Sequence, residues 1–314
     1  MNDSINRDTI RAAYSRIRSR VRRTPVLHTA AGDFGLSRPL TLKLECLQHA
    51  GSFKPRGVFN NLLSRDIPPA GLAAASGGNH GAAVAYGASR LARQAKVFVP
   101  ETASAAKVER IRELGADLHV EGSEYADAAA LCAAYVAETG AMELHPYDSP
   151  QTIAGQGTLA LEWDEQTFGL DTVLIAVGGG GLIAGAASWF GDKVKVVGVE
   201  PEGAATLHAA RAAGEPVDIE VNSIAADSLG ARRAGDLVFD ICREGVAEVV
   251  LVSDKAIRTA QQALWRDLRL AIEPGAAAAL SALMSGAYRP EPAERIGVLV
   301  CGGNVDLATL ENHS

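Results

Sequence analysis

Residues 172–182 read TVLIAVGGGGL, an apolar run that ends in four glycines and leads into a helix-forming segment. An apolar run of this length, bounded by glycines, is typical of a buried strand. Glycine lets successive backbone N–H groups turn toward one point, and an anion can approach because no Cβ is in the way. A helix that follows adds its N-terminal dipole. The stretch therefore predicts a strand, a phosphate-binding loop at Gly178, Gly179, Gly180 and Gly181, and a helix from Leu182.

The same alternation of apolar runs and alanine-rich segments continues through most of the chain. It predicts an α/β fold in which helices cover both faces of mostly parallel sheets. Strands are expected over 41–45, 72–75, 96–99, 117–120, 172–177, 195–199, 248–252 and 296–301. Helices are expected over 8–20, 55–64, 80–93, 103–114, 125–138, 152–165, 182–190, 254–267 and 274–285.

The length of 314 residues favours two domains. Residues 71–148 contain three strand–helix units in succession, and the turn-forming stretch PPAG precedes them at 68–71. We expect these residues to form a small domain, and residues 1–70 and 149–314 to form a large one. Each domain would be a three-layer open sheet.

Composition restricts the partners and the compartment. The formal net charge is −7, which argues against nucleic acid and anionic membrane as partners, because both usually require a basic surface. The chain begins without a signal-like apolar segment, and no apolar run reaches membrane length, so a cytoplasmic protein is expected. The cysteines lack the spacing of a disulfide framework or a zinc site; they are Cys46, Cys132, Cys242 and Cys301.

Residues 51–57 read GSFKPRG and place Lys54 at a strand-to-helix corner among small residues. An amine that forms a Schiff base must be partly desolvated and reachable, and a glycine-flanked turn meets both conditions. Most lysines are solvated surface charges, so the motif alone is weak. The other glycine-rich segments of the chain strengthen the interpretation of Lys54 as a Schiff-base lysine.

Residues 76–81 read SGGNHG and again lie between an expected strand and helix. Their backbone N–H groups and the helix N-terminus suit a substrate carboxylate. Asn79 can donate and accept in one plane, which fits a phenolic oxygen on a ring cofactor. The alternative is that Asn79 caps its own helix. His80, in the first helical turn, is more typical of a structural hydrogen bond than of a proton shuttle.

Residues 300–306 read VCGGNVD, a further strand tip followed by a glycine pair. Cys301 could face a heteroaromatic nitrogen or be a small buried thiol. Residues 179–184, GGGLIA, also fit the dinucleotide fingerprint, and Glu200 lies near the spacing of a ribose-binding acid. A nicotinamide-dependent oxidoreductase therefore stays open here, although it leaves Lys54 and Asn79 unexplained.

In their order, the four motifs resemble those of the fold-type II pyridoxal-phosphate (PLP) enzymes, which have a tryptophan synthase β-like fold. The nearest group is that of the threonine/serine dehydratases and serine racemases. The similarity covers nearly the whole chain and includes Leu44-Glu45 before the lysine and Glu273-Pro274 before a late helix.

The resemblance implies that Lys54 holds PLP as a Schiff base and that Gly178 to Gly181, with Leu182, hold its phosphate. Phe53 would pack beside the ring, Asn79 would contact the ring hydroxyl oxygen and Cys301 the ring nitrogen. Ser76, Gly77 and Gly78 would present N–H groups to the substrate carboxylate, beside Asn79 and His80. A homodimer is expected by the same analogy.

Two departures from the family pattern bear on chemistry. Racemases of this family carry a serine acid/base immediately before the Gly-Asn of the second motif, where this chain has Gly77, so elimination is favoured over racemisation. Some relatives bind a metal beside the glycine-rich loop. Glu200 matches its first ligand and Ala204 could supply a carbonyl, but Thr206 replaces an expected aspartate. A Mg²⁺ or Ca²⁺ site is thereby weakened and stays open.

We therefore expect a PLP-dependent ammonia-lyase that converts an L-serine- or L-threonine-type β-hydroxy amino acid to a 2-oxo acid and ammonium. Lys54 would remove the Cα proton. The alternatives are an amino-acid racemase of the same family and the nicotinamide-dependent oxidoreductase.

Overall fold

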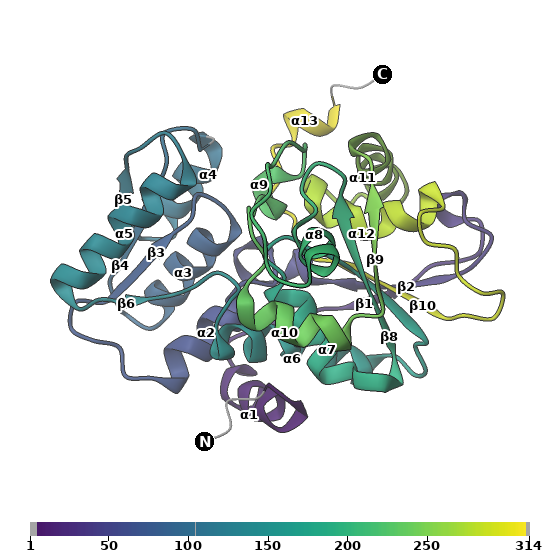
Figure 1. The fold of residues 1–314 in the computed structure, drawn as a ribbon, viewed down its shortest axis with the longest axis horizontal. Coiled ribbons are helices and arrows are strands. Elements are labelled where there is room, and N and C mark those ends of the chain that lie inside the picture. The colour runs from purple at the N-terminus through teal and green to yellow at the C-terminus, as the bar shows by residue number, and fades with distance from the viewer. Residues whose placement is uncertain (1–4, 104, 312–314) are drawn as a thin grey trace.

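The structure is a computed structural model that describes residues 5–103 and 105–311. Its strands form two sheets, which lie in separate lobes (Figure 1). The larger sheet has six strands, all parallel except β1, which pairs antiparallel with β2. In order across the sheet they are β1 (Val26–His28), β2 (Leu40–Leu44), β10 (Ile296–Val300), β7 (Thr172–Ala176), β8 (Lys195–Pro201) and β9 (Glu248–Val252).

The smaller sheet has four parallel strands. In order they are β5 (Asp117–Val120), β4 (Ala95–Val99), β3 (Leu72–Ala75) and β6 (Met142–Glu143). Helix α5 (Tyr125–Thr139) packs on β3 and β4, and on the other face lie α3 (Asn79–Arg90) and α4 (Ala105–Glu113) (Figure 1).

Helices also cover both faces of the larger sheet (Figure 1). One face carries α11 (Asp254–Leu268) and α12 (Pro274–Ser285), and the other carries α6 (Pro150–Gln166) and α7 (Gly181–Phe190). Helices α1 (Arg7–Ile17) and α2 (Pro55–Ser64) pack on α6. The remaining helices are α8 (Thr206–Ala213), α9 (Ala226–Leu229), α10 (Asp236–Gly245), α13 (Ala308–Glu311), and the 3₁₀ helices η1 (Asp33–Gly35), η2 (Glu45–Leu47), η3 (His49–Gly51) and η4 (Gly191–Lys193).

The predicted α/β class with mostly parallel strands is confirmed, and every expected strand and helix is present within three residues of its expected ends. The sequence did not predict the short strands β1 and β6 or the helices α8 and α10. The division into domains at 70/71 and 148/149 stays a prediction.

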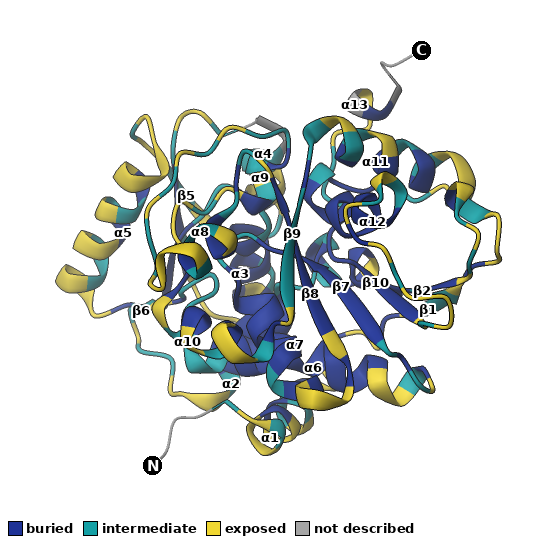
Figure 2. Ribbon diagram, turned by 45° about the vertical axis from the view of Figure 1, so that its right-hand side comes forward, coloured by how far each residue is buried: buried dark blue, intermediate teal, exposed yellow. Residues whose placement is uncertain are grey.

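The core of the larger sheet lies in β7, β8 and β10, whose residues are almost all buried (Figure 2). Their continuous apolar runs follow from the helices on both faces. Small residues allow those helices to approach closely. A Cβ on Gly297 of β10 would lie 2.6 Å from the Trp163 ring of α6. Among the described residues, no helix combines the length and apolar character needed to cross a bilayer.

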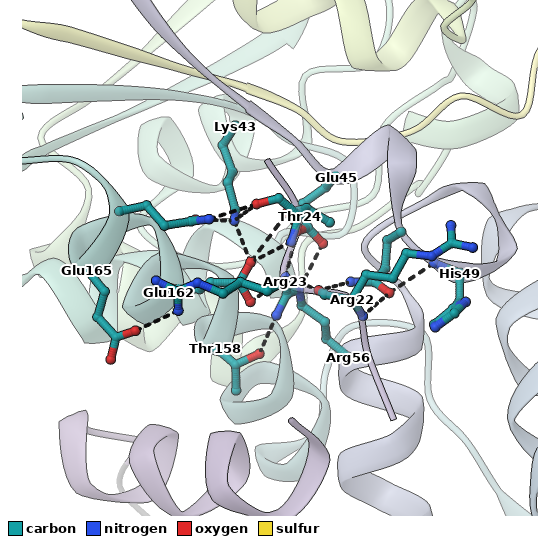
Figure 3. A network of polar contacts seen from close by, with 12 residues as sticks. Arg22, Arg23, Thr24, Lys43, Glu45, His49, Arg56, Thr158, Glu162 and Glu165 are labelled. Carbon is teal, nitrogen blue, oxygen red and sulfur yellow. Dashed lines mark hydrogen bonds and ion pairs between the residues drawn. The ribbon is translucent and has the colours of Figure 1, made fainter. Parts of the chain in front are cut away.

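A buried network of charges joins β2, α2 and α6 (Figure 3). Arg56 of α2 donates to both oxygens of Glu45, at 2.8 and 2.7 Å. Its Nη2 also donates to Glu162 of α6 at 3.1 Å. Lys43 of β2 donates to the other oxygen of Glu162 at 2.6 Å. The four side chains are at most 1% exposed.

The network matches each buried charge with an opposite one. Burial alone would raise the pKa of Glu45, but the Arg56 guanidinium lowers it below its ordinary value. Because the folded-state pKa is lowered, this stabilisation is present above the unfolded-state pKa and is lost as the pH falls through the folded-state one. The network therefore fixes α2, whose first turn follows Lys54, against the rest of the large sheet.

Removing Arg56 should leave the buried Glu45 without its ion-pair partner and Glu162 with Lys43 alone. We expect Arg56→Met to lower the free energy of unfolding by about 3–5 kcal/mol, measured by urea denaturation. Arg23→Met is the matched control because it breaks the half-exposed pair between Arg23 and Glu165, and it should cost less than about 1 kcal/mol. Equal losses in the two variants would contradict the role of the buried network.

Candidate active site

The four glycine-containing motifs meet at the carboxyl ends of parallel strands. They follow β2, β3, β7 and β10, at the edge where open α/β sheets bind ligands. Two adjoining cavities lie there, of about 40 Å³ and about 540 Å³. Lys54, Asn79, Tyr147, Gly179 and Ser228 line both. The smaller cavity runs along the glycine loop, and the larger one opens toward α4 and α9.

Lys54 lies at the junction of the two cavities. Its Nζ donates to the Pro146 carbonyl at 2.7 Å and lies 5.2 Å from the centre of the Phe53 ring. Burial lowers the pKa of Lys54 to about 8, although Cys301 and Glu273 raise it in part. The amine is therefore poised to lose its proton near neutral pH, as a Schiff-base lysine must.

The lysine motif is joined directly to the last motif. The Phe53 N–H donates to the Cys301 carbonyl at 3.1 Å, and the Gly303 N–H donates to the Gly51 carbonyl at 2.8 Å. An isolated antiparallel bridge joins Ser52 to Gly302 between these bonds. The Cys301 side chain is buried, which raises the pKa of its thiol and keeps it neutral.

The glycine loop makes a sharp turn into α7. Gly180 is left-handed with φ +89°, and α7 begins at Gly181. A Cβ on Gly179 would lie 2.3 Å from a ring carbon of Tyr147. Leu182, in the first turn of α7, is buried and lines the smaller cavity. Only glycine permits this close approach of the loop to its surroundings.

The second motif differs from expectation at two N–H groups, those of Ser76 and Gly78, which donate within the protein. The Ser76 N–H donates to the Phe98 carbonyl at 3.0 Å in the ladder of β3 and β4, so the expectation that it would face a substrate carboxylate is wrong. The Ser76 hydroxyl instead accepts from the Gly78 N–H at 3.3 Å. Helix α3 begins at Asn79, and its first two residues, Asn79 and His80, line the larger cavity.

Two further positions of this motif have defined surroundings. His80 Nε2 donates to the Leu144 carbonyl at 2.6 Å, and burial lowers the pKa of His80 to about 3, so the ring is neutral. A Cβ on Gly77 would lie 2.9 Å from Val99 Cγ1 and 3.0 Å from Ala103 Cβ. A serine at position 77 would therefore require these side chains to shift.

Glu200 does not have the surroundings of a metal ligand or a ribose-binding acid. Its Oε1 accepts from the Thr206 hydroxyl at 3.0 Å and the Leu207 N–H at 2.8 Å, and its Oε2 accepts from the His208 N–H at 2.8 Å. Burial raises the pKa of Glu200 to about 7. Among the described residues no cluster of three His, Cys, Asp or Glu side chains could hold a metal ion.

Glu200 thus closes the N-terminus of α8, and the Thr206 hydroxyl also contacts the Gly178 carbonyl at 2.6 Å. The buried Ala204 N–H donates to the Pro201 carbonyl. Glu200 therefore holds the start of α8, and Thr206 joins that helix to the glycine loop. Protein donors already satisfy both carboxylate oxygens, so these residues do not fit a divalent cation.

Several residues of the site were not predicted from the sequence, and three of them contact the motif residues directly. Tyr147 covers the glycine loop from the segment before α6. Glu273 lines the smaller cavity and accepts from Asn79 at 2.6 Å. Asn304 donates to Asn79 at 2.7 Å. Two sequence features could have indicated them: the Glu-Pro pair before α12, which contains Glu273, and Asn304 directly after the last glycine pair.

The family model described as "Pyridoxal-phosphate dependent enzyme" matches residues 17–302. Phenylserine dehydratase of Ralstonia pickettii is 38% identical over 95% of this chain and 93% of its own length. L-threonine ammonia-lyase of Geobacter sulfurreducens is 35% identical, covering 96% of this chain and 76% of that protein. The structure of maize serine racemase superposes with a TM-score of 0.92 at 36% identity, covering 97% and 95% of the two chains.

These matches agree with the four motifs and remove the nicotinamide alternative, which also needed Glu200 free to bind a ribose. The chain belongs to the pyridoxal-phosphate-dependent enzymes of fold type II, and within them it is a lyase of the threonine/serine dehydratase type.

Proposed function

We propose that Lys54 binds PLP and acts as the base at substrate Cα in the elimination of water from a β-hydroxy amino acid. The observation that carries this proposal is the position of the Lys54 amine, which lies where the cavities beside the lysine motif and the glycine loop meet. Its pKa of about 8 suits both roles.

The residues around Lys54 fit PLP. The loop from Gly178 to Gly181 offers a cradle in which added Cβ atoms would collide with the protein, together with a helix N-terminus for a phosphate. The neutral Cys301 thiol suits an unprotonated ring nitrogen. Asn79 offers its amide to the ring oxygen, and Phe53 lies beside the lysine.

The chemistry that PLP supplies when bound is an electron sink for the charge left at substrate Cα. Lys54 Nζ, once neutral, accepts the Cα proton. The N-terminal N–H groups of α3 bind the substrate carboxylate, and so orient the Cα–H bond toward the lysine. Elimination breaks the Cα–H and Cβ–O bonds and releases water. Hydrolysis of the Cα–N bond then takes up a water molecule and gives a 2-oxo acid and ammonium.

Elimination is favoured because position 77 carries no side chain. Racemisation requires a proton donor on the face opposite Lys54, and glycine offers none. A Cβ at position 77 would already lie within 3.0 Å of Val99 and Ala103, which leaves little space for a side chain there. The 2-oxo acid is therefore proposed as the main product, with the D-enantiomer a minor one.

The larger cavity supports a substrate whose side chain carries no charge. The cationic side chains along its mouth already have acidic partners, and two tyrosines, Tyr125 and Tyr147, line the same space. A carboxylate on the substrate would have to compete with those partners for the cations. The pairs are Lys107 with Asp227 at 3.0 Å, Arg233 with Asp236 at 3.3 Å, and Arg232 with Glu124 at 3.9 Å.

Three further expectations belong to this proposal. A homodimer in the cytoplasm is proposed by analogy with the family. No divalent cation is included, because the Glu200 carboxylate is satisfied by Thr206, Leu207 and His208. Neither nucleic acid nor membrane is proposed as a partner, in keeping with the acidic net charge.

Lys54→Ala should lower turnover by about three orders of magnitude or more, because it removes both the amine that holds PLP and the base. Steady-state release of 2-oxo acid measures this. The control is Lys255→Ala, at an exposed position of α11, which should behave as wild type. A Lys54→Ala variant with more than about a tenth of wild-type activity would show that another group is the base.

Gly180→Ala should weaken PLP binding about tenfold or more, since the methyl group would strain a left-handed residue and press on Val238 Cγ1 at 2.5 Å. The matched control is Gly140→Ala. Gly140 also has positive φ, but nothing lies within 4 Å of its Cβ position. Both variants should lose stability in thermal denaturation, and only Gly180→Ala should lose PLP affinity by fluorescence titration. If Gly180→Ala and Gly140→Ala bound PLP with equal affinity, the loop would only connect β7 to α7 and would not bind the phosphate.

With L-threonine and L-threo-phenylserine the enzyme should release 2-oxo acid faster than D-enantiomer, measured by a keto-acid assay and chiral chromatography. The value of kcat/KM for these neutral substrates should exceed that for β-hydroxyaspartate by about tenfold or more, because the acidic side chain finds no unpaired cation. A preference for β-hydroxyaspartate would refute the neutral-substrate proposal, and faster racemisation would refute the lyase assignment.

A further inference from the structure

The Asn79 side chain is held on both sides by other side chains. Its Nδ2 donates to Glu273 Oε1 at 2.6 Å, and its Oδ1 accepts from Asn304 Nδ2 at 2.7 Å. Asn79 comes from α3 of the smaller sheet, whereas its two partners flank α12 and β10 of the larger one. The amide therefore links the two lobes at the wall of the smaller cavity.

The contacts of Asn304 determine which way the Asn79 amide is oriented. Asn304 Nδ2 also donates to the Ala50 carbonyl at 2.8 Å. Both N–H groups of Asn304 thus have acceptors, and a flipped Asn304 amide would bring its oxygen against that carbonyl. Asn79 must then present its oxygen to Asn304 and its nitrogen to Glu273, which leaves one N–H of Asn79 free to donate into the cavity.

Two glycines of the site motifs make room for this arrangement. A Cβ on Gly51, whose φ is +74°, would lie 2.2 Å from Asn304 Oδ1, and a Cβ on Gly302 would lie 1.9 Å from Glu273 Oε1. Neither position tolerates a side chain while the amides keep these contacts. The glycines of the first and last motifs thus serve the hydrogen-bond chain as well as the backbone.

Glu273 ends the chain in a buried position. It is 3% exposed, and its Oε2 has no hydrogen-bond partner within the described residues. Burial raises the pKa of Glu273 to about 7, so the carboxyl is neutral below that pH and charged above it. The ionisable groups around it are Lys54, Lys107, Asp227, Cys46 and Cys301.

We propose that Asn304 and Glu273 are positioning residues that hold the Asn79 amide as a hydrogen-bond donor toward the ring oxygen of PLP. The inference rests on the proposed function, in which PLP occupies the smaller cavity. Asn304 fixes which end of the amide faces inward. Glu273 polarises the donor, more strongly when its carboxyl is ionised.

Asn304→Asp tests the first role, because it removes both N–H groups and places a carboxylate oxygen against Asn79 Oδ1. We expect PLP affinity, measured by fluorescence titration, to fall about tenfold or more. The visible absorption of the bound cofactor should also change. The control is Asn222→Asp, at an exposed position, which should bind PLP as wild type does.

Glu273→Gln tests the second role and keeps the shape of the side chain, so it serves even if Asn304→Asp fails to fold. The absorption spectrum of bound PLP in the wild type should titrate near pH 7, where Glu273 ionises. This titration should vanish in Glu273→Gln and persist in the exposed control Glu202→Gln. A spectrum whose pH dependence survives in Glu273→Gln would overturn the role of Glu273.

A double-mutant cycle separates positioning through Asn79 from a direct or structural effect. In an Asn79→Ala background, Asn304→Asp and Glu273→Gln should cause little further loss of PLP affinity. If these substitutions lowered PLP affinity as much in the Asn79→Ala protein as in the wild type, the inference would be overturned. Failure of wild-type protein to bind PLP at Lys54 would instead overturn the proposed function, so the two failures are distinguishable.

Discussion

The buried pairing of Arg56 with Glu45 and Glu162 is the interaction on which the site depends most directly. Arg56 lies two residues after Lys54, so the side chain that anchors α2 also sets where the reactive amine emerges. Two buried cations and two buried anions are stable only as a complete set, because each unpaired charge would carry its full desolvation cost. The network thereby makes the lysine loop a rigid part of the large sheet (Figure 3).

Burial disfavours the charged form of several groups of the site. It lowers the pKa of Lys54 to about 8 and that of His80 to about 3, and it raises the pKa of the Cys301 thiol. Glu273 has a pKa raised to about 7. A pocket of this kind contains little negative charge that would repel an anionic cofactor. The glycine loop supplies backbone dipoles in place of formal charge.

Strand and helix periodicity was sufficient to predict the sheets and the helices that cover them. The strands β1 and β6 were not predicted, because three and two residues are too few to show an alternation of apolar and polar side chains. The four motif loops were found because glycine-rich turns after apolar runs mark the carboxyl ends of parallel strands. Lys54 and Cys301 could be placed there for that reason.

Contacts between distant segments could not be predicted from local patterns. The Ser76 N–H joins a ladder bond to Phe98, and Glu200 binds the start of α8, a helix that the sequence did not reveal. Asn304 reaches Asn79 across 225 positions of sequence. Such bonds depend on tertiary geometry, which residue identity alone does not specify.

The position of β10 has a consequence for biosynthesis. This strand follows every other strand of the large sheet in the sequence, yet it lies between β2 and β7. During synthesis, the edges of β2 and β7 stay unpaired until β10 has been made, and such edges invite aggregation. The Lys54 loop also lacks its partners Cys301 and Gly303 until then. The nascent chain therefore cannot complete its cofactor pocket gradually, and capture of the cofactor follows translation of the last motif.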